Sequence, residues 1–400
     1  MINVEKKEKC CGCTACANVC PVQCISMQPD SEGFMYPVVD KSVCIECGKC
    51  ERVCPVLNSE KSGNNYDKKC FLARTKDNAV LMEGTSGGVG TTLALDVVKK
   101  EGIAYGAVFD ENFRVVHKGI DNTKDIVKFS GSKYVQSDLT GVFERVKNEL
   151  SYGKRVIFTG TPCQIYGLKN YLGKDYDNLL LVDLVCHGVP SPKIWENYIQ
   201  YLNNKYGRLK YANFRKKAYG YHVTTMEEVF ENNKRQLGSA RTNLMLKCFF
   251  KNIADRPICY ECPFKTLDRC SDITLFDGWH AKELVKGLED DDKGYTNVII
   301  HTIKGEEALL NNRELESIQV DLNKAIQLDG SMMFNSVKKH PQREAFYKMF
   351  NELGIEEAVK EFLTITKKDK FIESCKLILF KIGVIKHIKS IKSKLEKRGK

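Results

Sequence analysis

The feature that most constrains this chain is a cysteine spacing that occurs twice within its first 58 residues. Each copy reads Cys-x2-Cys-x2-Cys-x3-Cys-Pro, and the copies end at Pro21 and Pro55. Three cysteines at intervals of three residues can wrap a loop around one iron–sulfur cube, while the fourth is turned away at the proline and ligates the other cube. The spacing therefore predicts two [4Fe–4S] clusters that exchange one ligand each.

The ligand sets follow from that exchange. One cluster is predicted to be held by Cys10, Cys13, Cys16 and Cys54, and the second by Cys44, Cys47, Cys50 and Cys20. Zinc ribbons also use Cys-x2-Cys pairs, but two complete runs closed by proline favour clusters over zinc. Residues 33–39 are predicted to form a strand of a small ferredoxin-type sheet. Cys11 and Cys24 fall outside the pattern and are predicted to pack as small hydrophobes.

Length and composition place the chain among globular proteins. Its 400 residues predict two or three domains, and 18 cysteines are too dilute for a disulfide scaffold. No run reaches the roughly 18 apolar residues of a membrane helix. The start of the chain also lacks the apolar stretch of a signal peptide. We therefore expect a cytoplasmic protein whose cysteines serve redox chemistry.

After a polar stretch over residues 58–65, predicted to be a linker, the body mixes strand and helix patterns. The glycine-rich residues 84–92 precede a helical run over 93–100, and a glycine-rich helix start can receive a phosphate. Such a start is also common in plain structure. In the polar loop 130–137, Lys133 lies beside Tyr134. A lone lysine in a loop is usually solvated, and it would have a functional role only beside a ligand.

Residues 154–186 predict a βαβ unit whose helix begins at Pro162. Cys163 and Cys186 then follow neighbouring parallel strands, at the edge where open α/β sheets place their sites. A further Cys-x2-Cys pair needs two more ligands to hold a metal, and a packed pair of thiols is the alternative. The pair is Cys259 and Cys262, and the candidates for the remaining ligands are Cys163, Cys186 and Cys270.

Several motifs occur in an order that resembles one family. Besides the cysteine runs they are residues 86–88 (Ser-Gly-Gly), 132–137 (Ser-Lys-Tyr-Val-Gln-Ser), 160–164 (Gly-Thr-Pro-Cys-Gln), 186–192 (Cys-His-Gly-Val-Pro-Ser-Pro) and 259–264 (Cys-Tyr-Glu-Cys-Pro-Phe). Together they resemble the coenzyme F-420 hydrogenase/dehydrogenase beta-subunit family over most of the chain, from about residue 10 to about residue 345. The resemblance implies an iron–sulfur flavoprotein that binds FAD.

The implied fold combines α+β and α/β parts. A 2[4Fe–4S] ferredoxin-like domain (1–58) precedes a larger mixed α/β flavin-binding body and a C-terminal basic helix. Within the body, residues 66–150 resemble the N-terminal part of the beta subunit and residues 151–345 its C-terminal part. Residues 346–400 are predicted to form the helical basic tail.

Carried over by position, the resemblance implies flavin contacts at Ser86, Gly87, Gly88, Ser132, Lys133 and Gln136. It also implies a third [4Fe–4S] cluster at Cys163, Cys186, Cys259 and Cys262, with Cys270 as a replacement for one of the four. One segment departs from the family's usual Gly-Asp-Phe-Trp-Gly, because residues 276–280 read Phe-Asp-Gly-Trp-His. The shape or ligand of that segment is therefore expected to differ.

The implied function is an oxidoreductase that moves electrons from a low-potential donor, a redox protein or reduced coenzyme, through the clusters and FAD. The acceptor is a two-electron small molecule, a deazaflavin in some members. Clusters pass single electrons, and a flavin joins them to two-electron chemistry. Lys133 is a candidate for steadying negative charge on the reduced flavin, and His187 for delivering a proton. The simpler alternatives are that Lys133 binds phosphate and His187 caps a turn.

Two other classes of function remain open from the sequence. One is a non-catalytic iron–sulfur electron-transfer adaptor without flavin, in which the ferredoxin-type domain docks a partner. The other is a transferase or glycan-modifying enzyme that carries clusters. Nucleic acid is not expected as a partner, because the body has no basic motif interleaved with aromatic residues.

The positive charge of the chain is concentrated at its end. Residues 371–400 hold nine Lys or Arg against two Asp or Glu, within a formal net charge of +11 for the whole chain. Apolar residues at spacings of three and four, from Phe371 to Leu395, predict a basic amphipathic helix. This helix is predicted either to dock on its own domain or to lie as a peripheral contact on the inner face of an anionic membrane.

Overall fold

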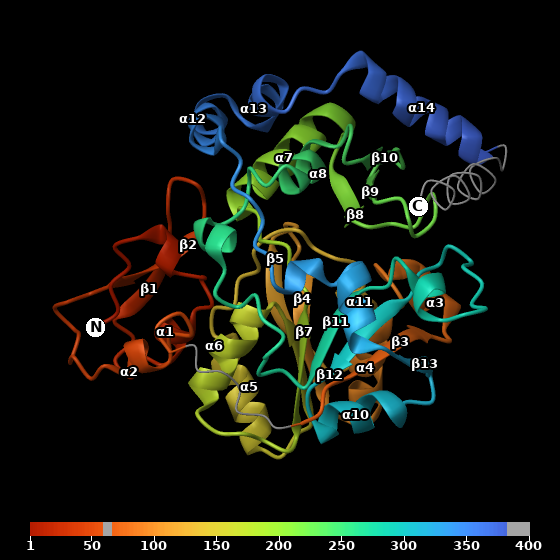
Figure 1. Cartoon of the computed structure of the whole chain (residues 1–400). Coiled ribbons are helices and arrows are strands. Elements are labelled where there is room, and N and C mark those ends of the chain that lie inside the picture. The colour runs from red at the N-terminus through yellow and green to blue at the C-terminus, as the bar shows by residue number, and fades with distance from the viewer. Residues whose placement is uncertain (59–65, 382–400) are drawn as a thin grey trace.

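The computed structural model describes residues 1–58 and 66–381 and shows a small N-terminal domain beside a larger α/β body (Figure 1). In the small domain β1 (Ile25–Pro29) pairs antiparallel with β2 (Met35–Val39). The strand predicted over 33–39 is therefore confirmed from residue 35. The helical segments of this domain are η1 (Lys7–Lys9), α1 (Ala15–Asn18) and α2 (Lys49–Arg52). The predicted fold class, a ferredoxin-type domain before a mixed α/β body, is confirmed.

One eight-stranded sheet forms the centre of the body. In spatial order its strands are β13 (Leu315–Val320), β3 (Lys69–Thr75), β12 (Thr296–Ile300), β11 (Ile273–Asp277), β7 (Leu179–Leu184), β6 (Val156–Gly160), β4 (Ile103–Phe109) and β5 (Val115–Ile120). The neighbours β11, β7, β6 and β4 run parallel, and the flanking pairs are antiparallel. Strands from before and after residue 150 share this sheet, so a boundary at residue 150 does not separate two sheets.

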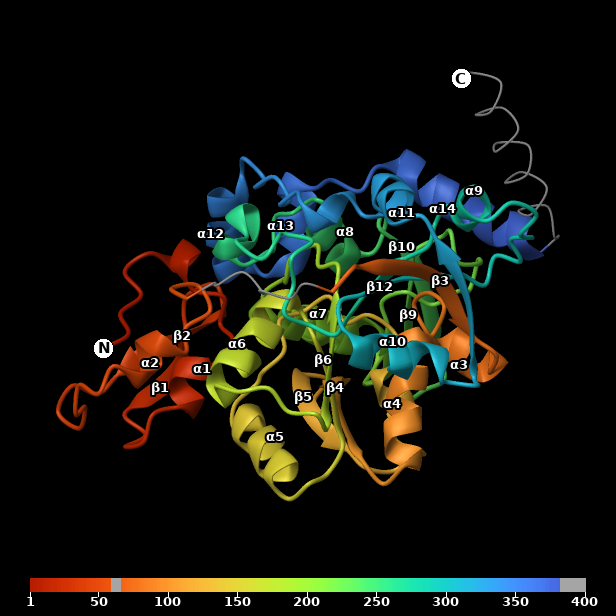
Figure 2. The same cartoon turned by 60° about the horizontal axis from the view of Figure 1, so that its bottom comes forward.

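Helices cover both faces of the sheet. They are α3 (Asn78–Glu83), α4 (Val89–Lys99), α5 (Val142–Ser151), α6 (Pro162–Leu172), α9 (Ala281–Leu284), α10 (Ile303–Leu310) and α11 (Leu322–Asp329), with the short η2 (Ile126–Phe129), η3 (Pro257–Glu261) and η4 (Ser331–Met333). Successive side chains of a strand point to opposite faces. Val156 and Phe158 therefore pack with α5 and α6, whereas Ile157 packs with α4. Figure 2 shows α5 and α4 on opposite sides of β4.

The predicted βαβ unit is confirmed. Strands β6 and β7 are parallel and paired, with α6 between them along the chain. Helix α6 begins at Pro162, and Thr161 and Gln164 form a capping box that satisfies free backbone groups at its start. This arrangement brings the turns after β6 and β7 side by side at one edge of the sheet.

A second core lies at one end of the main sheet (Figure 1). It contains a three-stranded antiparallel sheet in the order β10 (Arg235–Ser239), β9 (Thr225–Phe230) and β8 (Leu209–Asn213). Four helices pack with it: α7 (Pro192–Tyr206), α8 (Leu244–Phe250), α12 (Arg343–Leu353) and α13 (Ile355–Phe362). Helix α7 begins as the sequence suggests, because the Ser191 hydroxyl accepts from the Lys193 backbone N–H ahead of Pro192.

The last described helix, α14 (Lys367–Lys381), docks on this second core. Glu373 accepts from the backbone N–H of Ser239 at 2.9 Å and from its hydroxyl at 2.7 Å. Phe371 and Ile378, two members of the predicted apolar stripe, are exposed. A third member, Cys375, is half-buried. The remaining members lie outside the described residues: Ile382, Ile385, Ile388, Ile391 and Leu395. Residues 59–65, most of the predicted linker, also lie outside them. Within residues 1–58 and 66–381, the structure contains no helix with the length and apolarity needed to cross a membrane.

Candidate cluster and cofactor sites

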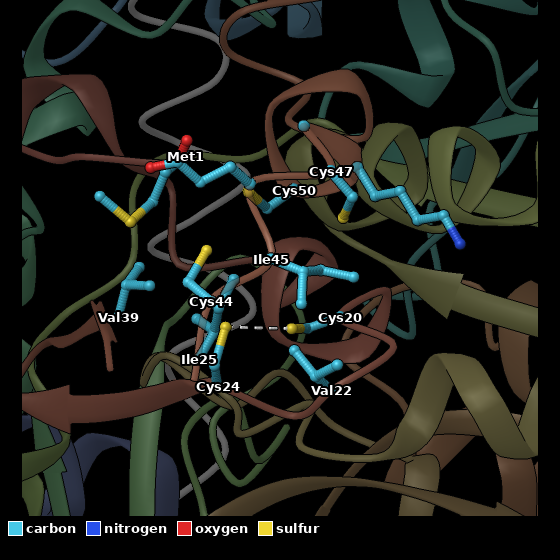
Figure 3. A pocket seen from close by; sticks show the side chains of 13 residues that line it. Met1, Cys20, Val22, Cys24, Ile25, Val39, Cys44, Ile45, Cys47 and Cys50 are labelled. Carbon is cyan, nitrogen blue, oxygen red and sulfur yellow. Dashed lines mark hydrogen bonds between the residues drawn. The ribbon is translucent and has the colours of Figure 1, made fainter. Parts of the chain in front are cut away.

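The second predicted cluster set lines a cavity in the N-terminal domain. Cys20, Cys44, Cys47 and Cys50 all border it (Figure 3). The rest of its wall is mainly aliphatic, from Val22, Ile25, Val39 and Ile45. Four thiols in an apolar pocket are the donor set of a [4Fe–4S] cluster, so the residues present fit that group. Cys24 also borders this cavity, with its sulfur 3.4 Å from that of Cys20.

The first predicted set also comes together in the N-terminal domain. The pKa of Cys16 is raised to about 12, mainly by burial and further by the nearby thiols of Cys10 and Cys54. Cys13 is buried and lies close enough to Cys10 and Cys16 to interact electrostatically with both. Within the described residues no three His, Cys, Asp or Glu side chains are arranged to hold a single metal ion. The structural support for the second set is its shared cavity, and for the first set it is the proximity of its thiols.

A third group of cysteines lines a separate cavity between the N-terminal domain and the body. The four cysteines implied by the family resemblance, Cys163, Cys186, Cys259 and Cys262, all border it. Cys163 lies in the first turn of α6, Cys186 follows β7, and the other two lie in η3 and at its end. Cys270 does not border this cavity. Burial raises its pKa, with Lys169 and Asp183 close to it.

Sequence reasoning missed Cys11 as a member of this third group. The structure buries Cys11 and Cys24, as predicted for packing residues, but Cys11 also borders the third cavity. Contact with Cys11, together with burial, raises the pKa of Cys163 well above its ordinary value. The sequence signal for this role was that Cys11 directly follows Cys10. A residue next to a predicted cluster ligand is held at the place where the N-terminal domain meets the body.

Gln136 and Arg256 connect the N-terminal domain to the body. The Gln136 amide donates through Nε2 to the Cys11 carbonyl at 3.1 Å and accepts from Arg256 Nη1 at 2.9 Å. Arg256 also donates to the Met35 carbonyl at 3.0 Å. The structure therefore places Gln136, an implied flavin contact, at the interface and off the wall of the large cavity described next. Its amide is already used there by two partners, so a role at FAD stays a prediction.

A cavity of about 490 Å³ lies at the carboxyl ends of β6, β7 and β11. This is the edge at which open α/β sheets bind ligands, and the volume is typical of small-molecule sites, which span about 300 to 1,000 Å³. Ser86, Gly88, Ser132 and Lys133, four of the six implied flavin contacts, line it. Gly87 does not line it. Its N–H donates to Thr296 Oγ1 at 2.8 Å, and a Cβ at Gly87 would lie 2.5 Å from the Ala73 carbonyl oxygen.

The start of helix α4 faces this cavity. Gly88 caps the helix with φ at +74°, and Val89, Gly90 and Thr91 of the first turn line the wall. A helix N-terminus presents free N–H groups and a partial positive charge, which suit a phosphate. The cavity and this helix start fit a dinucleotide cofactor such as FAD.

The two predicted catalytic residues, Lys133 and His187, both line the cavity, but they have different hydrogen-bond partners. The Lys133 ammonium donates to three carbonyls, those of Lys128, Ser130 and Gly131, at 3.0 to 3.3 Å. Burial lowers its pKa to about 8. All three of its hydrogens are thus directed at the loop it belongs to. This gives Lys133 a part in shaping the loop, and its action on a flavin stays a prediction.

His187 lies between the large cavity and the third cysteine group. Its Nε2 is 2.8 Å from Asn252 Oδ1, and its ring packs on Phe249 with centroids 4.5 Å apart. Burial lowers the pKa of His187, and the Asn252 contact offsets part of that effect. Residues 186–189 line both cavities, so a single turn separates them.

Sequence reasoning also missed a charged corner of the large cavity. Arg215, just beyond β8, forms an ion pair with Asp277 at 3.2 Å. The Trp279 ring lies 4.8 Å from the centre of the Arg215 guanidinium. Asp277 and Trp279 keep the Asp and Trp of the family's usual Gly-Asp-Phe-Trp-Gly, whereas the departures of this segment are at residues 276, 278 and 280. The departures therefore did not indicate this corner.

Comparison with known proteins agrees with the two-part architecture. Residues 153–324 match the family model for the C terminus of the coenzyme F420 hydrogenase/dehydrogenase beta subunit, and residues 9–58 match that of a 4Fe-4S dicluster domain. The coenzyme F420-dependent sulfite reductase of Methanocaldococcus jannaschii is 31% identical over 234 residues, which cover 56% of this chain and 34% of that protein. The chain thus spans about a third of the length of the curated relative it matches.

A solved structure of the F420-reducing [NiFe] hydrogenase complex from Methanosarcina barkeri, a xenon derivative, also aligns with the chain. The alignment covers 73% of this chain and 90% of the matched chain, at 18% identity and a TM-score of 0.40.

Proposed function

Because the chain joins a 4Fe-4S dicluster domain to a region of the coenzyme F420 hydrogenase/dehydrogenase beta-subunit family, we propose that it is an iron–sulfur flavoprotein oxidoreductase. The eight pattern cysteines of the N-terminal domain would hold two clusters, and Cys163, Cys186, Cys259 and Cys262 would hold a third, which would supply single electrons. The large cavity would hold FAD, which would exchange these electrons with a two-electron donor or acceptor.

The observation that carries this proposal is the continuity of the three sites. Cys11 follows Cys10, a ligand of the first predicted cluster, and borders the third cysteine cavity. Residues 186–189 then border both that cavity and the large one. A route of this kind suits electron transfer, because neighbouring sites are bordered by the same residues or by residues adjacent in the chain.

A bound FAD supplies the exchange between one-electron and two-electron chemistry, and the clusters supply single electrons. The chain's own residues bind and orient these groups. The first turn of α4 offers backbone N–H groups for phosphate, and Ser86 and Ser132 offer hydroxyls on the same cavity. Lys133 holds the loop over 128–131 in place through its three carbonyl contacts.

His187 is the candidate for handling a proton beside the cofactor. Asn252 Oδ1 can only accept, so the contact between them places a hydrogen on His187 Nε2 and leaves Nδ1 for a second proton. Burial lowers the pKa of His187, so the ring is mainly neutral near pH 7 and Nδ1 can accept a proton. We propose that His187 passes this proton to a reduced substrate.

The named relative suggests a donor and an acceptor to test first. Its name combines coenzyme F420 with sulfite reduction. We propose reduced coenzyme F420 as a first donor and sulfite as a first acceptor for assay. The chain spans only a third of that relative, so other two-electron substrates belong in the same panel.

The test is anaerobic reconstitution of the full chain with iron, sulfide and FAD. A broad cluster absorption with structured flavin peaks, and FAD in the supernatant after boiling, are expected. At four irons per cubane, about twelve irons per chain are expected if the third cluster forms and about eight if it does not. Clusters with no retained flavin contradict the proposal and favour a non-catalytic electron-transfer adaptor.

A further inference from the structure

Arg215 carries a buried hydrogen-bond donor that nothing in the described chain satisfies. Its side chain is 6% exposed and lines the large cavity. Nη1 donates to the Tyr134 hydroxyl at 3.1 Å and to Asp277 at 3.2 Å, whereas Nη2 is buried without a hydrogen-bond partner. Among the described residues that line this cavity, no other has a buried side-chain nitrogen or oxygen in that condition. Buried polar groups in proteins are normally paired, so this one requires an explanation.

The surroundings hold the guanidinium in one orientation. The Trp279 ring packs against it at 4.8 Å, and Tyr221 stacks on Trp279 with centroids 4.3 Å apart. The Tyr221 hydroxyl donates to the second oxygen of Asp277 at 3.2 Å. Two hydrogen bonds and an aromatic stack thus fix Arg215 before any ligand arrives, which reduces the ordering cost of binding.

The other charged side chains on the cavity wall already have partners. Asp277 is satisfied by Arg215 and Tyr221. Asp329 accepts from His280 at 2.6 Å and from Asn297 at 3.2 Å. The Lys133 ammonium is directed at backbone carbonyls. Among these charged groups, Arg215 Nη2 is therefore the donor without a hydrogen-bond partner.

We propose that Arg215 binds an oxyanion of the two-electron substrate, a carboxylate, phosphate or sulfur oxyanion group. Guanidinium groups bind such oxygens through short, charge-assisted hydrogen bonds. Residues 276–280 supply both Asp277 and Trp279, the two positions at which this segment keeps the family's usual residues. The inference rests on the proposed function for the flavin that this substrate would meet in the same cavity.

The experiment is a titration of the reconstituted full chain with inorganic phosphate at constant ionic strength, followed by tryptophan fluorescence. The chain has two tryptophans, of which Trp195 is fully buried in the second core and Trp279 contacts Arg215. We expect a saturable change in the wild type and at least tenfold weaker binding in Arg215→Gln. Arg208→Gln, an exposed arginine just before β8, is the matched control and should bind phosphate as the wild type does.

Further variants guard against loss of folding. Arg215→Lys keeps a positive charge, and Arg215→Gln combined with Asp277→Asn keeps the charge balance of the corner. Trp279→Phe should abolish the fluorescence change while leaving phosphate binding detectable by calorimetry. Circular dichroism of each variant establishes that it folds.

Three results separate the hypotheses. Equal phosphate affinity in Arg215→Gln and wild type, or no saturable change in the wild type, overturns the site. Competition between phosphate and FAD, with FAD lost from Arg215→Gln, assigns the guanidinium to the cofactor's phosphate and overturns the substrate assignment. A chain that retains no flavin but binds phosphate through Arg215 refutes the proposed function and supports the oxyanion site.

Discussion

Arg256 donates through Nε to the carbonyl oxygen of Cys10 at 2.7 Å, and its Nη2 lies 3.5 Å from the Cys10 sulfur. The guanidinium is fully buried and lies 4.2 Å from the Tyr36 ring. A residue of the body therefore fixes a positive charge beside a predicted cluster ligand of the N-terminal domain. The same side chain joins the two parts of the molecule and places a positive charge beside the first predicted cluster.

Replacing Arg256 by Gln should make the reduction potential of the first cluster more negative. Reduction adds an electron, which a nearby cation and a hydrogen bond to sulfur both favour. A redox titration monitored by electron paramagnetic resonance measures the shift. Arg343→Gln is the matched control, because Arg343 also crosses the interface, donating to both oxygens of Glu32 at 2.8 and 2.6 Å, but hydrogen-bonds to no cysteine. Equal shifts in the two variants would show that loosened docking, and not the charge, sets the potential.

Gly12→Ala should weaken the interface more than its backbone strain explains. Gly12 has φ at +68°, and a Cβ there would lie 2.5 Å from Gln136 Nε2 and 2.8 Å from Arg256 Nη1. Gly173, at the end of α6, has the same φ of +68° and no atom within 4 Å of such a Cβ. Gly173→Ala therefore reports the strain alone, about 1–2 kcal/mol. Thermal unfolding should show a larger loss for Gly12→Ala, and similar losses would argue against the tight approach at the interface.

Cys20→Ser should remove the cluster of the second run and leave that of the first. Cys20 lines the cavity with Cys44, Cys47 and Cys50, although it belongs to the first run in sequence. Iron analysis should fall by about four irons per chain, the content of one cubane. Cys24→Ser tests specificity, because Cys24 borders the same cavity outside the pattern and its loss should leave the iron content unchanged. Damage to the first cluster instead would refute the exchanged ligand.

His117→Asn should flatten the loss of stability in mild acid. His117 is buried on the wall of the large cavity, with Nδ1 2.8 Å from Ser137 Oγ and Nε2 3.0 Å from the Thr159 carbonyl. Burial lowers its pKa from 6.5 to about 4. The unfolded chain therefore binds the proton first, and stability falls as the pH drops from 6.5 to 4, by up to about 3 kcal/mol.

Denaturant unfolding of wild type and His117→Asn from pH 7.5 to 4 measures this effect. At pH 7.5 the difference between the two proteins reports the lost hydrogen bonds and the lost stacking on Phe158. That difference should shrink toward pH 4. Parallel curves over the whole range would mean that His117 does not titrate on unfolding.

Membrane contact through the basic end of the chain can be tested by a deletion that removes none of the described residues. Deleting residues 382–400 removes seven Lys or Arg and one Glu and keeps the contacts of Glu373 with Ser239. If the tail contacts membranes, the full chain should sediment with anionic liposomes at low salt and be released at high salt, while the truncated chain should not sediment. Equal sedimentation of the two chains at low salt would contradict membrane contact through residues 382–400.

The parts of the fold that could be predicted are those that depend on the spacing of residues close together in the sequence. The cysteine runs and the start of α6 at Pro162 depend on residues within a few positions of one another, so the sequence alone indicates them. The contacts of Arg256 with Cys10 join residues 246 positions apart, and no pattern near either residue marks them. Gln136 shows the same limit: its motif was readable, but its amide turns toward the N-terminal domain because of where that domain docks.

The oxyanion corner illustrates a further limit of sequence reasoning. Arg215 is an ordinary arginine beyond a strand, and its importance depends on Asp277 and Trp279, which arrive from a strand more than 50 residues later. Asp277 and Trp279 match the family pattern and Arg215 lies outside the motifs of the resemblance, so the buried Nη2 is visible only once the side chains are packed.

The position of β3 in the main sheet also bears on the order in which the protein is made. Residues 69–75 pair on one side with β12 and on the other with β13, which leave the ribosome more than 200 residues later. The N-terminal domain is complete once residue 58 has emerged, so it can fold early in synthesis. The body must wait until residue 320 has been translated. Insertion of the predicted clusters into the first domain thus has a long interval in which to occur before the main sheet is complete. A nascent chain stalled before residue 296 would contain the cysteines of both N-terminal clusters but not the complete large cavity.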